Sequence, residues 1–101
     1  MPDPSSPFAS LAALATILGD VTRWRILLEL AKGEALPVLE LARRLHAKRN
    51  RISKHMAVLR EARLVVVGFG RLYALAPSMV VRREEGVLDL GRCLVRLDAL
   101  D

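Results

Sequence analysis

Apolar residues recur at helical spacing through the first half of the chain. One stripe lies within residues 8–18, a second within residues 20–33 and a third within residues 37–45. Residues at i, i+3, i+4 and i+7 share one face of an α-helix, so this spacing predicts three amphipathic helices. A fourth is predicted over residues 50–62, where Ile52, Met56 and Leu59 form the apolar side.

Several residues fit the ends of these helices. Asp20 is suited to N-cap the second helix, because its carboxylate can accept a hydrogen bond from an unpaired backbone N–H. Lys32 and Gly33 suit its C-terminal end, where a cation meets the negative end of the helix dipole and glycine can adopt positive φ. Pro37 suits the first position of the third helix, since the missing N–H would be unpaired there anyway.

The third and fourth helices are separated only by residues 46–49, which matches a helix-turn-helix unit. The period then changes to a β-branched run at residues 64–67, followed by Gly68-Phe69-Gly70 and a second apolar run up to Pro77. This pattern predicts a β-hairpin over residues 64–75, with the glycines supplying the positive φ of its turn. The predicted class is therefore mainly α with a small β-hairpin (α+β), a winged helix-turn-helix.

The remaining segment, residues 78–101, is compatible with either a helix or a strand. Charged residues recur at helical spacing within it, but Gly86 and Gly91 would each cost roughly 1 kcal/mol inside a helix. Either form leaves an apolar face that a chain of 101 residues covers poorly, and such a face usually marks a subunit interface. The residues expected at a homodimer interface are Leu11, Leu14, Leu90, Leu94 and Leu97.

The chain thus divides into a flexible leader (residues 1–7), a winged helix-turn-helix domain (residues 8–77) and a C-terminal dimerisation segment (residues 78–101). The leader reads Met-Pro-Asp-Pro-Ser-Ser-Pro, and its three prolines oppose helix formation. Hydrophobic residues make up 52% of the chain and charged residues 27%, which is typical of a folded globular protein.

Positive charge is concentrated in one region. The whole chain carries +5, but residues 43–63 contain eight basic residues and one acidic residue, so this region is +7 and the rest sums to −2. A polyanionic partner that binds this region is the simplest interpretation. A solvated charged helix face is the alternative.

With the apolar side of helix 50–62 buried, its polar side points outward and can enter the major groove of double-stranded DNA. Arginine and lysine can pair with guanine and asparagine with adenine, mostly from the N-terminal end of such a helix. The expected base contacts are Asn50, Arg51, Ser53, Lys54 and Arg49. The expected phosphate contacts are Arg43, Arg44, Lys48, His55, Arg60 and Arg71. A packed His55 and a cross-strand pair for Arg71 are the alternatives.

Four stretches of the sequence resemble the ArsR-type (arsenic-repressor-like) family of regulators. They are residues 18–27 (LGDVTRWRIL), 40–45 (ELARRL), 52–62 (ISKHMAVLREA) and 70–73 (GRLY). The resemblance implies a homodimeric repressor of transcription, with helix 50–62 as recognition helix and hairpin 64–75 as wing. Arg63 stands where the family usually has glycine, and would be strained if its backbone is left-handed.

The chain departs from the metal-sensing members of this family. Some carry paired cysteines at the start of the first helix-turn-helix element, but residues 35–39 contain none; others use ligands in the C-terminal helix, but residues 78–101 contain no histidine. A transition-metal site needs three or four convergent donors. We therefore expect no metal and no cofactor. Cys93 is interpreted as a small buried hydrophobe, with a redox switch as the alternative.

The sequence also points to a cytoplasmic protein. One cysteine indicates a reducing compartment, and no apolar run approaches the roughly 18 residues that would cross a membrane. No nucleophile–base pair or phosphate-binding loop is evident, so we expect no enzymatic activity. A protein-interaction module or an architectural module without operator specificity remains the alternative to a sequence-specific DNA-binding regulator.

Overall fold

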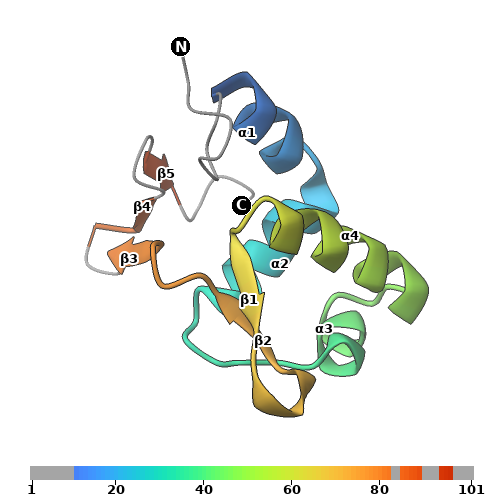
Figure 1. The fold of residues 1–101 in the computed structure, drawn as a ribbon. Coiled ribbons are helices and arrows are strands. Elements are labelled where there is room, and N and C mark those ends of the chain that lie inside the picture. The colour runs from blue at the N-terminus through green and yellow to red at the C-terminus, as the bar shows by residue number, and fades with distance from the viewer. Residues whose placement is uncertain (1–10, 83–84, 90–93, 97–101) are drawn as a thin grey trace.

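A computed structural model describes residues 11–82, 85–89 and 94–96 of the chain (Figure 1). Four helices are followed by two small antiparallel sheets, of order β1-β2 and β3-β4-β5. This is the predicted winged helix-turn-helix class. The elements are α1 (Leu11–Leu18), α2 (Val21–Leu30), α3 (Val38–Arg44), α4 (Arg49–Glu61), β1 (Val65–Val67), a 3₁₀ turn η1 (Phe69–Arg71), β2 (Tyr73–Leu75), β3 (Val80–Arg82), β4 (Val87–Asp89) and β5 (Leu94–Arg96).

The apolar stripes of the helices meet in one core. α4 packs against α2, α3 and β1, and its side chains Ile52, Met56 and Leu59 are completely buried. Trp24 of α2 is also a core residue, with 4% of its surface exposed. The helical period therefore identified the core-facing side of these helices correctly.

The predicted ends of α2 are confirmed, whereas the predicted start of α3 needs a correction. The Asp20 carboxylate accepts a hydrogen bond from the backbone N–H of Arg23 at 3.1 Å, and Gly33 has φ of +98°. Pro37, however, is not the first helical residue of α3. Its ψ of 159° is extended, so it is the N-cap, and its carbonyl accepts the first helical hydrogen bond from Leu41 N–H.

The β1–β2 hairpin forms the wing (Figure 1), with Val66 opposite Ala74. The end of β2 that follows the turn is tied to the α2–α3 connection, because Leu36 and Tyr73 exchange two backbone hydrogen bonds of 2.8 Å. The expectation that both tip glycines supply positive φ is half right. Gly70 has φ of 77°, but Gly68 is extended, and Arg71 supplies the second positive value, 59°.

The C-terminal segment forms strands where it is described, which resolves the choice between helix and strand. β4 pairs with β3 on one side and with β5 on the other. Gly86 lies between β3 and β4 with φ of 65°, a conformation that a right-handed helix does not contain. Met79 and Leu88 are buried in the same core as the helices, so this sheet packs on the winged-helix body.

One expected interface residue is placed in the core instead. Leu14 is only 3% exposed and belongs to the core cluster, so its surface is already covered within the chain. The apolar spacing of Leu14 predicted that it is buried, but not whether its own chain or a second subunit covers it. Leu90, Leu97, the leader and residues 8–10 lie outside the described residues, as do the side chains of Leu11 and Leu94.

Arg63 ends α4 in a strained conformation. Leu64 N–H bonds to the Leu59 carbonyl and Arg63 N–H to the Arg60 carbonyl, the pattern of a Schellman motif. The left-handed position of that motif is Arg63, with φ of 62°. A side chain there costs about 1 kcal/mol that glycine avoids.

We therefore expect Arg63→Gly to raise the free energy of unfolding by up to about 1 kcal/mol, since relief of the strain exceeds the added chain entropy. Urea denaturation measures the change. Arg63→Ala is the control, because it removes the same charge but keeps a Cβ at positive φ. An equal gain in both variants would show that charge, and not backbone conformation, is responsible.

Candidate nucleic-acid interface

The exposed face of α4 carries all five predicted base-contacting residues. The buried residues of α4 fix its orientation, so the side chains between them must point away from the core. The exposed residues on this face are Arg49, Asn50, Arg51, Ser53, Lys54 and Ala57. The structure therefore brings together Asn50, Lys54 and their neighbours on one accessible surface.

The N-terminus of α4 lacks the usual stabilising groups. Lys48 is the N-cap and its side chain makes no capping hydrogen bond, and no acidic residue lies in the first turn. Instead Arg49 and Arg51 place cations at the positive end of the helix dipole, which is unfavourable in isolation. Unpaired backbone N–H groups together with nearby cations suit an anion such as a phosphate.

The turn before α4 sets this helix against α3. His46 has φ of 52°, and the N–H of Ala47 bonds back to the Ala42 carbonyl at 3.0 Å. His46 is exposed. The turn leaves Lys48 on the surface at the start of α4, beside Arg49.

Most cations of this surface have no acidic partner. Within the described ranges no carboxylate forms an ion pair with Lys48, Arg49, Lys54 or Arg60, and all four are exposed. Arg51 is exposed and makes a 3.4 Å hydrogen bond to the Thr22 hydroxyl. These charges are therefore available to a polyanion.

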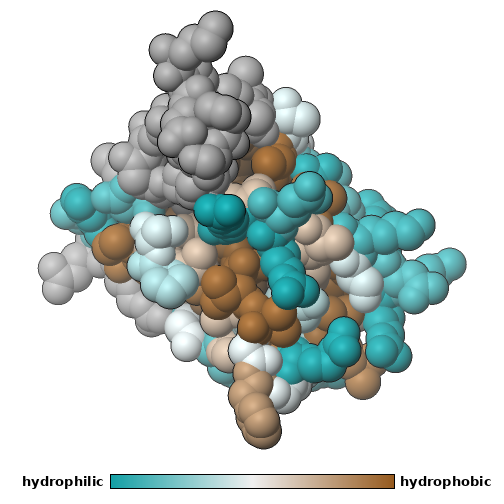
Figure 2. All heavy atoms as spheres, in the orientation of Figure 1, coloured by the Kyte–Doolittle hydropathy of each residue, from teal (hydrophilic) through white to brown (hydrophobic). Residues whose placement is uncertain are grey.

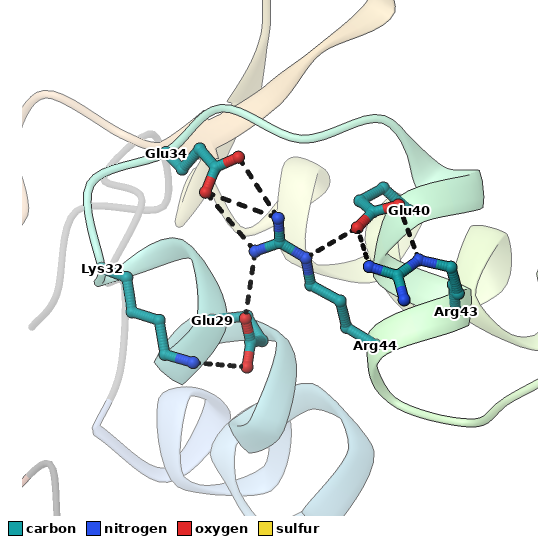
Figure 3. Close-up of polar contacts among 6 residues, drawn as sticks. All are labelled: Glu29, Lys32, Glu34, Glu40, Arg43 and Arg44. Carbon is teal, nitrogen blue, oxygen red and sulfur yellow. Dashed lines mark hydrogen bonds and ion pairs between the residues drawn. The ribbon is translucent and has the colours of Figure 1, made fainter.

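Arg44 has a different environment from the one predicted. Its guanidinium contacts Glu40 at 2.9 Å, Glu34 at 3.2 Å and Glu29 at 3.5 Å (Figure 3). The side chain is 26% exposed and joins α2, the α2–α3 connection and α3. Three carboxylates already surround its charge, which disfavours the predicted phosphate contact for Arg44.

Arg43 is paired as well. Its Nε donates to Glu40 Oε2 at 3.0 Å, and a second guanidinium nitrogen reaches Oε1. Hydrogen bonds from Arg43 and then Arg44 lower the pKa of Glu40 to about 2. Arg43 is thus paired within α3 while its side chain stays 71% exposed, and a phosphate contact for it stays a prediction. The i,i+3 and i,i+4 spacing from Glu40 was the sequence signal for both pairs.

His55 also turns inward. Its side chain is 16% exposed, its Nδ1 accepts from Arg23 Nε at 3.3 Å, and its Nε2 lies 3.9 Å from the Asp20 carboxylate. The structure therefore has the packed arrangement that was the alternative for His55, which disfavours the predicted phosphate contact. Asp20 has a lowered pKa, chiefly because of the Arg23 backbone N–H bond.

A groove connects the exposed face of α4 with the wing. It is lined by Ser53, Ala57 and Arg60 of α4, and by Tyr73 of β2 across from them. Arg63 and Glu61 also line it, a role that the sequence patterns did not indicate. The helix and the wing thus form one continuous surface.

Arg71 is exposed beside this surface and has no ion pair in the part of the chain that the structure describes. The alternative of a cross-strand pair is therefore not what is observed. Among the described residues, no three His, Cys, Asp or Glu side chains are grouped to hold a metal ion. None of the described helices is long and apolar enough to span a membrane.

Comparisons with known proteins agree with this geometry. A family model described as a helix-turn-helix domain matches residues 18–68, which contain α2, α3, α4 and β1. The NMR structure of the cadmium metal-sensor CMTR from Mycobacterium tuberculosis is 44% identical, with a TM-score of 0.58. The match covers 67% of this chain and 73% of that chain. No curated protein sequence matches the chain.

The contacts of Arg44 lead to a stability prediction. Arg44→Gln should lower the urea midpoint more than Arg43→Gln, because Arg44 contacts three carboxylates from different segments and Arg43 only one. Added NaCl should reduce the difference in urea midpoint between Arg44→Gln and the wild type, since salt screens exposed charges. Equal midpoints for the two variants would contradict a bridging role for Arg44.

The lowered pKa of Glu40 predicts how stability depends on pH. A carboxyl with a depressed folded-state pKa stabilises the protein above its unfolded pKa, and this contribution is lost as pH falls through the folded value. The difference in urea midpoint between wild type and Glu40→Gln should be full above about pH 4.5 and vanish towards pH 2. Glu61→Gln, at an exposed position outside these ion pairs, is the control. A difference in urea midpoint that does not change with pH would contradict the prediction.

Proposed function

Because the chain belongs to the ArsR-type family of winged helix-turn-helix, DNA-binding transcriptional regulators, we propose that it is a homodimeric repressor that reads a specific duplex sequence with α4. The observation that carries the proposal is the exposed, cationic face of α4, whose orientation is fixed by the buried residues opposite. Such a helix fits the major groove of B-DNA.

The proposed contacts divide into two kinds. Asn50, Arg51 and Lys54 reach base edges from the N-terminal half of α4, with Arg49 and Ser53 beside them. Phosphates are held by Lys48, Arg60 and Arg71, which are exposed and have no ion pair among the described residues. The phosphate contacts give affinity, and the base contacts give sequence discrimination.

The proposed homodimer places two copies of α4 in successive major grooves, roughly 34 Å apart on a pseudo-palindromic site. The C-terminal segment supplies the interface in this proposal, since its apolar pattern exceeds what so short a chain can cover. We further propose that the protein acts in the cytoplasm, where a single cysteine stays reduced, and that it has no enzymatic activity.

We do not propose cadmium sensing, the property named for the similar structure, for this chain. Thiolates are the ligands that select soft metals, and this sequence contains one cysteine, Cys93. The expectation that the chain binds no metal stays a prediction.

The proposal is tested with Lys54→Ala. The duplex used is one that wild-type protein enriches from a random library. We expect Lys54→Ala to weaken the affinity for this duplex by about tenfold or more, the usual value of a good base contact. Binding to unselected duplex should fall only slightly. Mobility shifts at fixed salt measure both affinities.

Arg60→Ala is the matched control. As a phosphate contact it should weaken binding to both duplexes equally and reduce the slope of log affinity against log salt by about one. Equal losses on both duplexes for Lys54→Ala would reassign Lys54 to a phosphate. A library without any enriched sequence would favour an architectural role, and no duplex binding even at low salt would favour a protein-interaction module; either result overturns the proposal.

A further inference from the structure

The tip of the wing carries the most exposed large hydrophobic side chain among the described residues. Phe69 has a relative exposure of 102%, whereas Val66 and Leu72 of the same hairpin have 42% and 38%. Figure 2 shows a hydrophobic group protruding where Figure 1 has the hairpin tip. A lone surface hydrophobe needs no explanation by itself.

The tip is closed by its own backbone. Gly68 N–H donates to the Leu72 carbonyl at 2.9 Å, and Arg71 N–H donates to the Gly68 carbonyl at 3.1 Å. Gly70 and Arg71 both have positive φ, which reverses the chain directly after Phe69. These bonds hold the backbone of Phe69 at the end of the hairpin. A pre-formed tip gives up little conformational entropy when Phe69 enters a binding partner.

The surroundings of Phe69 favour a polyanion over an apolar protein surface. Residues 64–75 contain no acidic residue, and Arg71 is exposed at the same tip without an ion pair among the described residues. The groove between Ser53 of α4 and Tyr73 of β2 makes the wing continuous with the face proposed to bind DNA. A duplex held by α4 therefore lies beside the wing.

We infer that Phe69 is an apolar wedge that inserts between two base pairs in the minor groove next to the α4 site. Side chains of this type partly unstack a base step and kink the duplex. Pyrimidine–purine steps unstack most easily, so the wedge selects DNA with such a step opposite the wing. Arg71 neutralises a phosphate at the same place. This inference rests on the proposed function of α4.

The experiment uses a duplex that the full chain enriches from a random library, labelled with 2-aminopurine at successive positions and with a donor–acceptor pair at its ends. Wild-type protein should raise 2-aminopurine fluorescence at one step and shorten the end-to-end distance. Phe69→Ala should abolish both signals and weaken binding by about tenfold, because a buried aromatic contact is lost. Phe69→Leu should retain a reduced kink, since leucine also acts as a wedge.

Two controls separate the wedge from other effects. Val66→Thr removes exposed apolar surface from the same hairpin but not from its tip, and should leave the kink unchanged. Lys54→Ala should weaken binding while the kink persists in the bound fraction. Circular dichroism confirms that each variant is folded, which is expected for Phe69→Ala because this side chain lies outside the core.

The outcomes distinguish this inference from the proposed function. Sequence-specific binding that depends on Lys54, but without unstacking or with equal unstacking in Phe69→Ala, overturns the wedge alone. Loss of affinity in Phe69→Ala without any unstacking signal in the wild type assigns Phe69 to a contact with backbone or protein, and also overturns the wedge. Failure of wild-type protein to bind any duplex overturns both.

Discussion

The burial of one side of α4 is the constraint on which the rest of the surface depends. Ile52, Met56 and Leu59 are each 0% exposed, and exposing such side chains costs about 1.5–3 kcal/mol apiece. Rotation of α4 about its axis would expose all three together. The direction of every other side chain on α4 is therefore set by its core, and Asn50 and Lys54 need no contacts of their own to face outward. The orientation of the surface proposed to bind DNA thus follows from ordinary hydrophobic packing.

The cations of the basic region serve two purposes that a charge count does not separate. Arg43 and Arg44 are both bound to Glu40 within α3, and Arg44 also joins α3 to Glu29 of α2 and to Glu34 of the connection that follows it. That arrangement supports the first helix of the helix-turn-helix unit. The cations of α4 itself have no acidic partners in the described ranges, and they are the ones placed to meet phosphate. The effective charge of the surface is thus smaller, and more sharply located on α4, than the sequence indicates.

Local features of this protein were predictable and long-range pairings were not. The N-cap Asp20 and the C-terminal Gly33 depend on neighbours within a few residues, so the sequence alone identifies them. The contact between Arg23 and His55 spans 32 positions and exists only after α2 packs on α4. No periodicity contains that information, which is why a phosphate contact was the natural expectation for a histidine in a basic helix.

The C-terminal segment and the first helix show a related limit. Apolar and polar residues within 85–96 fit both a helical and a strand period, and the turn at Gly86 decides for strands. Leu14 lies on a helical stripe that predicts burial, but a stripe does not say whether the chain's own core or a second subunit covers it. Fold class and core faces are therefore readable from this sequence, whereas the identity of the covering partner requires the packed structure.

The wing is a short hairpin of two three-residue strands, and backbone pairing fixes its position. Tyr73 exchanges hydrogen bonds with Leu36, and β1 packs on α4, so the hairpin is fixed to both ends of the helix-turn-helix unit. A regulator with a fixed helix and a fixed wing can test a duplex in two independent ways. In the proposed mode of binding, the helix reads donors and acceptors in the major groove. A rigid apolar tip instead tests how easily the neighbouring step deforms, so positions without any base contact can contribute to specificity.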